Sequence, residues 1–396
     1  MELRAAARRL RDIGKGRTIT FSPKVFIPLT RLCRDVCRYC AFRQAPERVP
    51  SPYMAPEEVL EVALAGQRVG CREALFVLGE RPEQRYSAAR RWLSERHYDS
   101  SLEYLREVCA LVLRETRLYP HSNAGILSRR ELMDLKKVNV SMGLMLETSS
   151  PRLCEAGGPH EHAPSKRPET RLRTLATAGE LKIPFTTGLL IGIGETVKER
   201  LESLSLIKNL HRRHGHIQEV IIQNFRAKAG TAMAGAPEAS LEEMLETVAL
   251  ARMVLGPQVN IQAPPNLAPS DPSYSSSGRS SVSGTSAPYL AYLEAGINDY
   301  GGISPLTRDY VNPEAPWPRI GWMRGRMSAL GYQLRARFPV YPEYFLEKTE
   351  FLPETLVKRL RQEADCRGYL GSDSWAGREV AARNSSENGS QLEAQL

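Results

Sequence analysis

Three cysteines near the N-terminus, Cys33, Cys37 and Cys40, are separated by three and then two residues. Three thiolates at this spacing can bind three irons of a cubane iron–sulfur cluster. Ordinary ferredoxin-type sites use four cysteines, and the next one here, Cys71, lies in another predicted element. The fourth iron is then open to an outside ligand, which chemistry at the metal requires. The spacing therefore predicts a reactive [4Fe–4S] cluster.

A structural zinc ion is the alternative occupant of this cysteine loop. Zinc takes four protein ligands in structural sites, but the nearest histidine, His97, is remote in the sequence. The chain has seven cysteines, an odd number with one cluster, which is not typical of a disulfide framework. This usage indicates a metal site in a reducing compartment and predicts a cytoplasmic protein.

The cysteine spacing, with Tyr39 directly before the third cysteine, resembles the signature of the radical S-adenosylmethionine (SAM) superfamily. The resemblance implies that the amino and carboxylate groups of SAM chelate the open iron, and it makes Tyr39 a cofactor-binding candidate. One electron from the cluster then splits SAM into methionine and a 5′-deoxyadenosyl radical, which abstracts hydrogen from a substrate. Because that electron has a low potential, the expected donor is a flavodoxin or a ferredoxin.

Other cofactor-binding candidates follow from the same resemblance. Gly79 and Glu80 match a Gly-Gly-Glu-like motif that meets the SAM amino group, although Leu78 replaces the first glycine. A carboxylate beside an ammonium is a sound pairing, and a solvated acid is the alternative. Glu147 or Ser149 is expected to hold the ribose hydroxyls, while Ser149 also suits a helix cap.

A basic run and two further strand ends complete the candidates. One cation among four is expected to pair with the SAM carboxylate, and Arg167 is the one selected from Lys166, Arg167, Arg171 and Arg173. For adenine the candidates are Gly192, whose flexibility suits close backbone approach, and Asn224. A tight turn is the alternative role for the glycine.

Histidines offer candidates for substrate contact and proton transfer. His121 and Asn123 end a predicted strand and are expected to face the substrate, while His160 and His162 are candidates for proton transfer. Each histidine taken alone is more typical of a surface or hydrogen-bonded residue.

Apolar, β-branched segments alternate with amphipathic helical patterns, which favours βαβ units and a parallel sheet. The pattern predicts a (βα)8 TIM-type barrel, with an incomplete six-stranded barrel as the alternative because the last two strands are weak. In such barrels the loops after the strands form the active face. The predicted strands are residues 24–29, 74–78, 119–123, 139–146, 185–191, 219–224, 259–263 and 297–300.

The domain organisation follows from composition along the chain. We expect a basic N-terminal extension over residues 1–17, possessing a short helix, and one barrel domain over residues 18–365. A serine-rich loop insertion is expected at 270–287, and a disordered tail at 366–396. One helix is predicted to begin near Pro56, and another to run from Val197 and stop before Gly215.

The overall charge is +9, from 54 basic and 45 acidic residues. The basic residues are scattered, so they favour acidic small molecules or an acidic redox partner over nucleic acid. No apolar run approaches the roughly 18 residues of a membrane span, and we expect no membrane association.

Several later strings together resemble the family of CofG-type subunits of FO synthase, also called 7,8-didemethyl-8-hydroxy-5-deazariboflavin synthases. The resemblance covers about Thr18 to Leu360, with the 270–287 insertion and Ala41, in place of an expected threonine, as departures. The strings are residues 120–125, 186–196, 223–228, 262–267, 296–305 and 309–318.

This resemblance implies a radical SAM carbon–nitrogen lyase. Its substrate would be 5-amino-5-(4-hydroxybenzyl)-6-(D-ribitylimino)-5,6-dihydrouracil, made by a CofH-type sister subunit. Its products would be the deazaflavin FO, 5′-deoxyadenosine, methionine and ammonium. The alternatives are the sister reaction that joins tyrosine to 5-amino-6-ribitylaminouracil, a menaquinone-pathway radical enzyme, an iron–sulfur carrier or sensor without turnover, and a zinc-stabilised binding protein.

Overall fold

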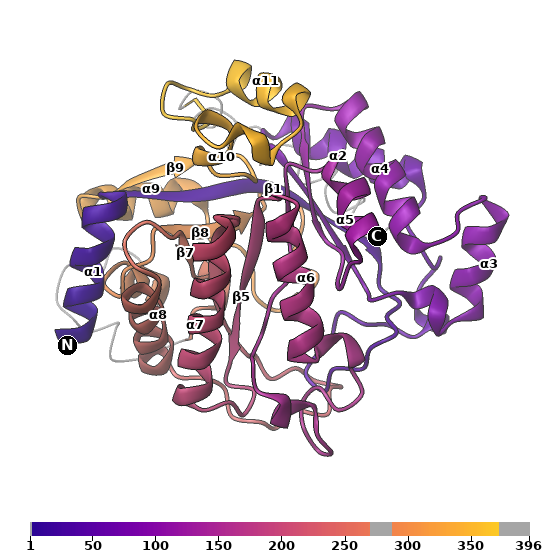
Figure 1. The fold of residues 1–396 in the computed structure, drawn as a ribbon, viewed down its shortest axis with the longest axis horizontal. Helices are drawn as coiled ribbons and strands as arrows, with labels where there is room; N and C mark the ends of the chain where they lie inside the picture. The colour runs from indigo at the N-terminus through magenta and orange to yellow at the C-terminus, as the bar shows by residue number, and fades with distance from the viewer. Residues whose placement is uncertain (1, 270–286, 372–396) are drawn as a thin grey trace.

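The computed structural model describes residues 2–269 and 287–371. Its strands form one sheet in the order β2-β3-β4-β5-β6-β7-β8-β1-β9, and a further pairing of β1 with β2 closes the first eight into a barrel (Figure 1). The strands are β1 Thr18–Thr30, β2 Glu73–Leu78, β3 Tyr119–Asn123, β4 Ser141–Gly143, β5 Phe185–Ile191, β6 Ile217–Asn224, β7 Ile261–Gln262, β8 Asp299–Ile303 and β9 Gln333–Ala336.

Strand β1 closes the barrel because it is long enough to pair with three neighbours. Its first residues pair with β9, Thr20 and Ser22 lie opposite Asp299 and Gly302 of β8, and the stretch from Lys24 onward pairs with β2. All these pairings are parallel. The (βα)8 prediction is therefore confirmed, and the six-stranded alternative is wrong.

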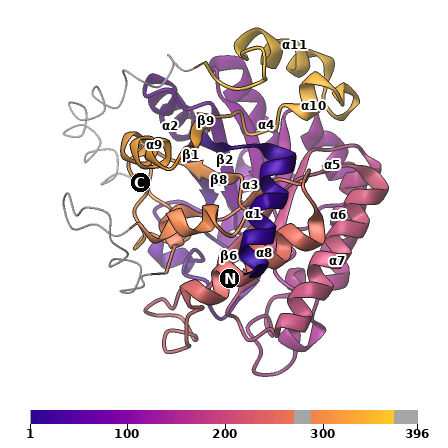
Figure 2. The same cartoon turned by 90° about the vertical axis from the view of Figure 1, so that its left-hand side faces the viewer.

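Helices cover the outside of the barrel, as Figures 1 and 2 show from two sides. The N-terminal helix α1 packs against α8, and its Arg11 is buried, donating to Ile297 O at 2.7 Å. The helices are α1 Glu2–Lys15, α2 Pro56–Arg68, α3 Ser87–Glu95, α4 Ser101–Glu115, α5 Arg129–Lys136, α6 Pro168–Glu180, α7 Val197–His214, α8 Leu241–Leu255, α9 Ile320–Ala329, α10 Glu343–Leu346 and α11 Glu354–Glu363.

Local sequence signals set the ends of two predicted helices. Helix α2 begins at Pro56, and Glu58 accepts from the Ala55 N–H, one of the donors that a helix start leaves without a partner. Helix α7 is capped by the Thr196 side chain and ends at Gly215, whose φ of 67° glycine adopts without strain. Both helix predictions are confirmed.

Several predicted strand bounds need correction. Strand β1 begins at Thr18, well before the predicted residue 24, because its early residues pair with β8 and β9. Strand β4 is shorter than predicted and gives way to the loop that carries Glu147 at φ 67°. Strand β8 lies at Asp299–Ile303, shifted from the predicted 297–300. The prediction ended too early because the strand includes two glycines, which lower strand propensity.

The chain's final described residues correct the expected start of the tail. Leu370 is buried, its N–H donates to Ala336 O at 3.0 Å, and it forms a bridge with Ala364. Residues 366–371 are thus packed on the barrel rather than disordered. The rest of the expected tail, 372–396, and the insertion up to residue 286 lie outside the described residues.

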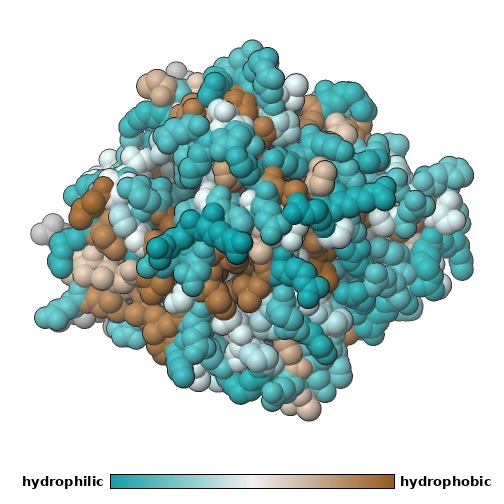
Figure 3. All heavy atoms as spheres, viewed as in Figure 1, coloured by the Kyte–Doolittle hydropathy of each residue, from teal (hydrophilic) through white to brown (hydrophobic). Residues whose placement is uncertain are grey.

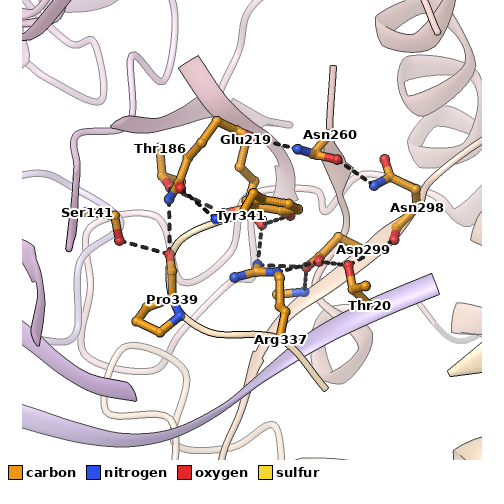
Figure 4. Close-up of polar contacts among 12 residues, drawn as sticks. Thr20, Ser141, Thr186, Glu219, Asn260, Asn298, Asp299, Arg337, Pro339 and Tyr341 are labelled. Carbon is orange, nitrogen blue, oxygen red and sulfur yellow. Dashed lines mark hydrogen bonds and ion pairs between the residues drawn. The ribbon is translucent and has the colours of Figure 1, made fainter. Parts of the chain in front are cut away.

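A segment after β9 seals the floor of the barrel, at the amino ends of the strands (Figure 4). Arg337 donates to both Asp299 oxygens, at 2.7 and 3.0 Å, and to Glu219 Oε1 at 2.8 Å. The Tyr341 hydroxyl donates to the same Glu219 oxygen at 2.8 Å. Because this floor is closed, ligands can enter the barrel interior only from the opposite mouth.

The face of the molecule in Figure 3 is mostly hydrophilic, with hydrophobic side chains gathered in its hollows. Among the described residues, none of the helices combines the length and the apolar character that a membrane crossing needs.

Candidate functional site

A cavity of about 350 Å³ opens at the mouth of the barrel, where the carboxyl ends of the strands lie. Each of β1 to β8, or the loop that follows it, contributes to its lining. The loop after β1 brings Cys33, Cys37 and Cys40 to one side of this cavity, and all three are free thiols. The structure thus places the predicted cluster ligands where barrel enzymes carry their active sites.

Backbone hydrogen bonds hold the cysteine loop to two neighbouring segments. The Arg34 N–H donates to Glu80 O at 2.7 Å, just after β2. The N–H groups of Val36 and Arg38 donate to His162 O at 2.8 Å and Pro159 O at 2.9 Å. The loop is therefore fixed from both sides, although it contains little regular structure.

The surroundings of the thiols suit a bound metal centre. Burial raises the pKa of Cys33 and of Cys37 to about 12, so the thiolates need a strong positive charge nearby. The Glu80 N–H donates to Cys33 Sγ at 3.1 Å, the type of contact that tunes iron–sulfur clusters.

The donor set favours a metal that binds sulfur. Soft thiolates select zinc, Cu(I) and iron–sulfur clusters, and a structural zinc site takes four protein ligands. The loop supplies three cysteines, which fits a cluster with three cysteine ligands.

Gly79 is required by the close approach of β2's end to the cysteine loop. A Cβ at this position would lie 1.9 Å from Leu32 O and 2.8 Å from Cys33 Cβ. No other residue fits without moving the backbone at Leu32 and Cys33. Gly79 lines the cavity as predicted, so its role includes room for the loop itself.

Glu80 presents a buried carboxylate to the cavity. Its Oε2 accepts from the Ile126 N–H at 3.2 Å, while the buried Oε1 has no hydrogen-bond partner among the described residues. Arg81 and Arg34 lie 3.5 and 3.9 Å from Oε1. Burial raises the pKa of Glu80. An acceptor without a donor beside the cysteines suits a ligand ammonium.

Glu147, in the loop after β4, also lines the cavity and is paired with two cations. Lys166 contacts its carboxylate directly, and Arg171 lies 3.6 Å away. Burial raises the pKa of Glu147, but Lys166 and Arg171 outweigh it, so the net shift is downward and the carboxylate is ionised. This trio lines the cavity, and its basic members are the neighbours of the predicted Arg167.

Four predicted cofactor residues do not line this cavity in the described structure. Arg167 is exposed at the start of α6, and Ser149 is held to α7, with its N–H donating to Ser203 Oγ at 2.8 Å. Gly192 has φ 86° and donates to Glu195 at 2.9 Å. The Asn224 amide donates to Leu267 O at 3.0 Å, but its Oδ1 is buried without a partner.

The aromatic and histidine candidates separate into three groups. Tyr39 lines the cavity, and its hydroxyl lies 3.0 Å from His160 Nε2. Burial lowers the pKa of His160 to about 3, so its ring is neutral. His162 is exposed, and His121 lies deeper in the barrel, hydrogen-bonded to Ser141 and Asn123. Of the expected substrate-facing residues, Asn123 reaches the cavity.

One part of the cavity wall was not assigned from sequence. It consists of side chains from β1, from β7 and the loop after it, and from the segment after β8, namely Lys24, Phe26, Gln262, Asn266, Asp309, Asn312 and Trp317. One signal was available in the sequence: Lys24 belongs to the apolar predicted strand of residues 24–29, and a lysine is rarely buried unless its charge has a partner. Most of the others lie in the strings that carry the family resemblance.

Comparisons with known proteins agree with this geometry. A family model of the radical SAM superfamily matches residues 27–207. The chain is 51% identical over 326 residues to the 7,8-didemethyl-8-hydroxy-5-deazariboflavin synthase of Methanopyrus kandleri, covering 82% of this chain and 92% of that protein. The FO synthase of Mycobacterium tuberculosis is 49% identical over 358 residues, covering 87% of this chain and 40% of that longer protein.

Solved structures show the same fold at low sequence identity. The [FeFe]-hydrogenase maturase HydG from Carboxydothermus hydrogenoformans has a TM-score of 0.67, 17% identity, and coverage of 99% of this chain and 85% of its own. Methylornithine synthase (PylB) has a TM-score of 0.63, 18% identity, and coverage of 84% and 88%.

The closed barrel with a three-cysteine loop after its first strand defines a radical SAM protein. Members of this superfamily use a [4Fe–4S] cluster and SAM. The identity of 51% over most of both chains then narrows the class, and the chain belongs to the 7,8-didemethyl-8-hydroxy-5-deazariboflavin synthase family.

Proposed function

We propose that this protein closes the deazaflavin ring of FO. The substrate is 5-amino-5-(4-hydroxybenzyl)-6-(D-ribitylimino)-5,6-dihydrouracil, and SAM is the cosubstrate. The products are FO, 5′-deoxyadenosine, methionine and ammonium. One observation carries the proposal: a single cavity joins the cysteine loop to a wall made of the segments that carry the family resemblance.

The cluster side of the cavity has residues for each part of SAM. When bound together, the cluster and SAM supply a 5′-deoxyadenosyl radical. We assign Glu80 Oε1 to the SAM ammonium, because Glu80 lines the cavity and this oxygen has no hydrogen-bond partner among the described residues, although Arg81 and Arg34 lie at ion-pair distance. Lys166 or Arg171 is placed to meet the carboxylate, and Glu147 lies where it can accept from ribose hydroxyls.

The barrel protects the reaction from water. Its floor is closed by Arg337 and its partners, and apolar side chains from several strands line the cavity wall, among them Leu75, Val77, Leu144 and Leu190. A reactive radical needs such exclusion, because water and oxygen divert it. The protein's own contribution is thus orientation of two ligands in a nearly dry cavity.

Electrons are proposed to enter from the outer side of the cysteine loop. A second cavity of about 560 Å³ lies there and shares Cys37 and Cys40 with the first. Its lining includes Arg38, Arg43 and Arg48. A basic surface attracts an acidic partner, and we assign this side to a flavodoxin or ferredoxin. The adduct itself is proposed to come from a CofH-type sister subunit in the cytoplasm.

The test is an anaerobic turnover assay. The protein is reconstituted with iron and sulfide and supplied with SAM, dithionite and the product of a CofH-type enzyme. We expect FO fluorescence together with 5′-deoxyadenosine. Deoxyadenosine without FO would retain the superfamily chemistry and contradict the substrate. If the protein, given tyrosine and 5-amino-6-ribitylaminouracil instead, forms the adduct of these two compounds, it catalyses the sister reaction.

A further inference from the structure

Lys24 is a buried cation in the wall of the main cavity, on the strand that leads into the cysteine loop. It lies on β1, its residue is 8% exposed, and it lines both the main cavity and the deeper space beneath it. Within the part of the chain that the structure describes, no hydrogen bond or ion pair of its ammonium is found. Its three N–H donors are therefore available to a ligand.

The structure makes specific room for this side chain. A Cβ at Gly302 of β8 would lie 2.3 Å from Lys24 Cδ and 2.7 Å from its Nζ. The ammonium lies 4.9 Å from the centroid of the Trp317 ring and 5.6 Å from that of Phe26. The Trp317 indole is itself fixed, because its N–H donates to Thr307 O at 3.1 Å.

An ammonium held this way is costly for the fold. Burial lowers the pKa of Lys24, although the nearest acids, Glu73, Asp309 and Glu219, act in the opposite direction. No carboxylate oxygen of these three acids lies within 4.0 Å of Lys24 Nζ, so they attract the ammonium without forming an ion pair. A buried charge without a hydrogen-bond partner destabilises a protein, and such groups concentrate where a ligand completes them.

The ligand that completes Lys24 must offer an acceptor oxygen beside a flat group. Trp317 and Phe26 provide aromatic surface around the ammonium, which suits the planar carbonyl–nitrogen–carbonyl part of a pyrimidine dione, a part that stays flat although C5 of the proposed substrate is tetrahedral. The carbonyl oxygens of this part are acceptors that point outward in its plane. Phenol and ribityl hydroxyls, in contrast, also donate and do not require a cation.

We propose that Lys24 anchors the pyrimidine ring of the substrate by donating a hydrogen bond to one of its carbonyl oxygens. This inference rests on the proposed function, since that function supplies a pyrimidine dione as substrate. Lys24 acts as a positioning residue: it holds the pyrimidine in the deeper part of the cavity, so that the hydroxybenzyl group faces the cysteine loop and SAM.

The test uses binding of the fluorescent product FO to the reconstituted protein under anaerobic conditions. Lys24→Met keeps an unbranched side chain one atom shorter than lysine and removes its charge. We expect FO to bind about ten- to a hundredfold more weakly, the range of a charged hydrogen bond. Lys136→Met is the matched control, because Lys136 lies on the outer helix α5 and donates to Leu181 O. The FO affinity of this variant should equal that of wild type.

Two further measurements separate anchoring from a structural role. The melting temperature of Lys24→Met should not fall below that of wild type, because an unpartnered buried charge has been removed. Gly302→Ala keeps the lysine but obstructs its path, so FO binding should weaken there as well. In wild type, 5-amino-6-ribitylaminouracil, which has the pyrimidine but no phenol, should displace FO, and Lys24→Met should weaken its binding too.

The contradicting results are equally defined. Unchanged FO affinity in Lys24→Met, or a loss of affinity matched by a lower melting temperature, would overturn the role of Lys24. Neither result would affect the proposed function as long as wild type still forms FO. If wild type neither forms nor binds FO, the proposed function itself fails.

Discussion

The floor and the mouth of the barrel both contain buried charged side chains, but they differ in how these are paired. At the floor, Arg337 bonds to Asp299 and Glu219, and Tyr341 completes the group. At the mouth, Glu80 Oε1 has no hydrogen-bond partner and Lys24 has no acid within bonding distance among the described residues. Both regions lie in the same barrel and have similar burial.

This difference separates two uses of buried charge. The floor is complete within the chain, so its charges maintain the barrel and exclude water from below. At the mouth, Glu147 is paired with Lys166 and Arg171, but Glu80 Oε1 has no hydrogen-bond partner among the described residues, and the Lys24 ammonium has none either, so ligand atoms can complete these two groups. Substitutions at the floor should therefore change stability, whereas substitutions at the mouth should change ligand binding with little loss of stability.

The largest effect is expected for Cys37→Ala at the mouth. Without one of three thiolates the cluster is lost, so 5′-deoxyadenosine and FO formation should both fall to background. Iron and sulfide analysis with visible absorption measures the cluster directly. The exposed Cys366 provides the control, and Cys366→Ala should retain iron and activity. A Cys37→Ala variant with full iron content and turnover would contradict the assigned ligands.

Arg337→Met at the floor should cause the largest loss of stability. It leaves two buried carboxylates, Asp299 and Glu219, without their shared cation. Removing one partner of a buried ion group costs about 3–5 kcal/mol. Denaturant unfolding followed by circular dichroism measures this loss. A variant as stable as wild type would show that the floor network does not support the barrel.

Glu80→Gln at the mouth should weaken SAM binding about tenfold, the effect of one charged hydrogen bond. Stability should not fall, because burial already disfavours this charge, as its raised pKa indicates. Equilibrium binding of SAM to the reconstituted enzyme, with a thermal melt of the same sample, provides both values. If the variant melted well below wild type while binding SAM normally, the Glu80 carboxylate would stabilise the fold, like the charged groups at the floor, instead of binding SAM.

The smallest expected effect is a pH dependence at the floor. Burial and Asp299 raise the pKa of Glu219 to about 7, although Arg337 opposes them. The folded protein then retains a proton that the unfolded chain releases near its ordinary pKa of 4.5. Stability from this group is therefore present at low pH and is lost as the pH rises from about 4.5 to 7.

Glu219→Gln cannot titrate and isolates this contribution. The stability of wild type relative to Glu219→Gln should decrease between pH 5 and 7, by on the order of 1–3 kcal/mol. Unfolding curves for both proteins at several pH values measure the difference. A difference that stays constant over this range would show that Glu219 is ionised throughout.

The sequence was sufficient for the features that depend on local spacing. Strands β3 and β5 and the ends of α7 were predicted at their observed bounds, and for α7 the Thr196 cap and Gly215 determine both ends locally. The cysteine loop was also predicted, because its chemistry depends on its spacing. Strand β9 was missed: it has four residues, and its pairing with β1 is distant in sequence.

Side-chain direction was what the sequence did not provide. Lys166, Arg167 and Arg171 are close neighbours, yet Arg167 faces solvent while the other two reach Glu147. Ser149 likewise turns to α7 through Ser203. Lys24 was missed because a single lysine in a strand has no motif, and its place in the cavity wall depends on closure of the barrel by β8.

The most direct measurement of the central claim is the transfer of hydrogen from the substrate. The adduct is prepared from tyrosine with deuterium at every carbon-bound position of the hydroxybenzyl group, and turnover is followed by mass spectrometry of 5′-deoxyadenosine. If the cavity holds this group against SAM while the ring closes, 5′-deoxyadenosine should gain one mass unit as FO accumulates. Formation of FO with unlabelled 5′-deoxyadenosine would contradict the account.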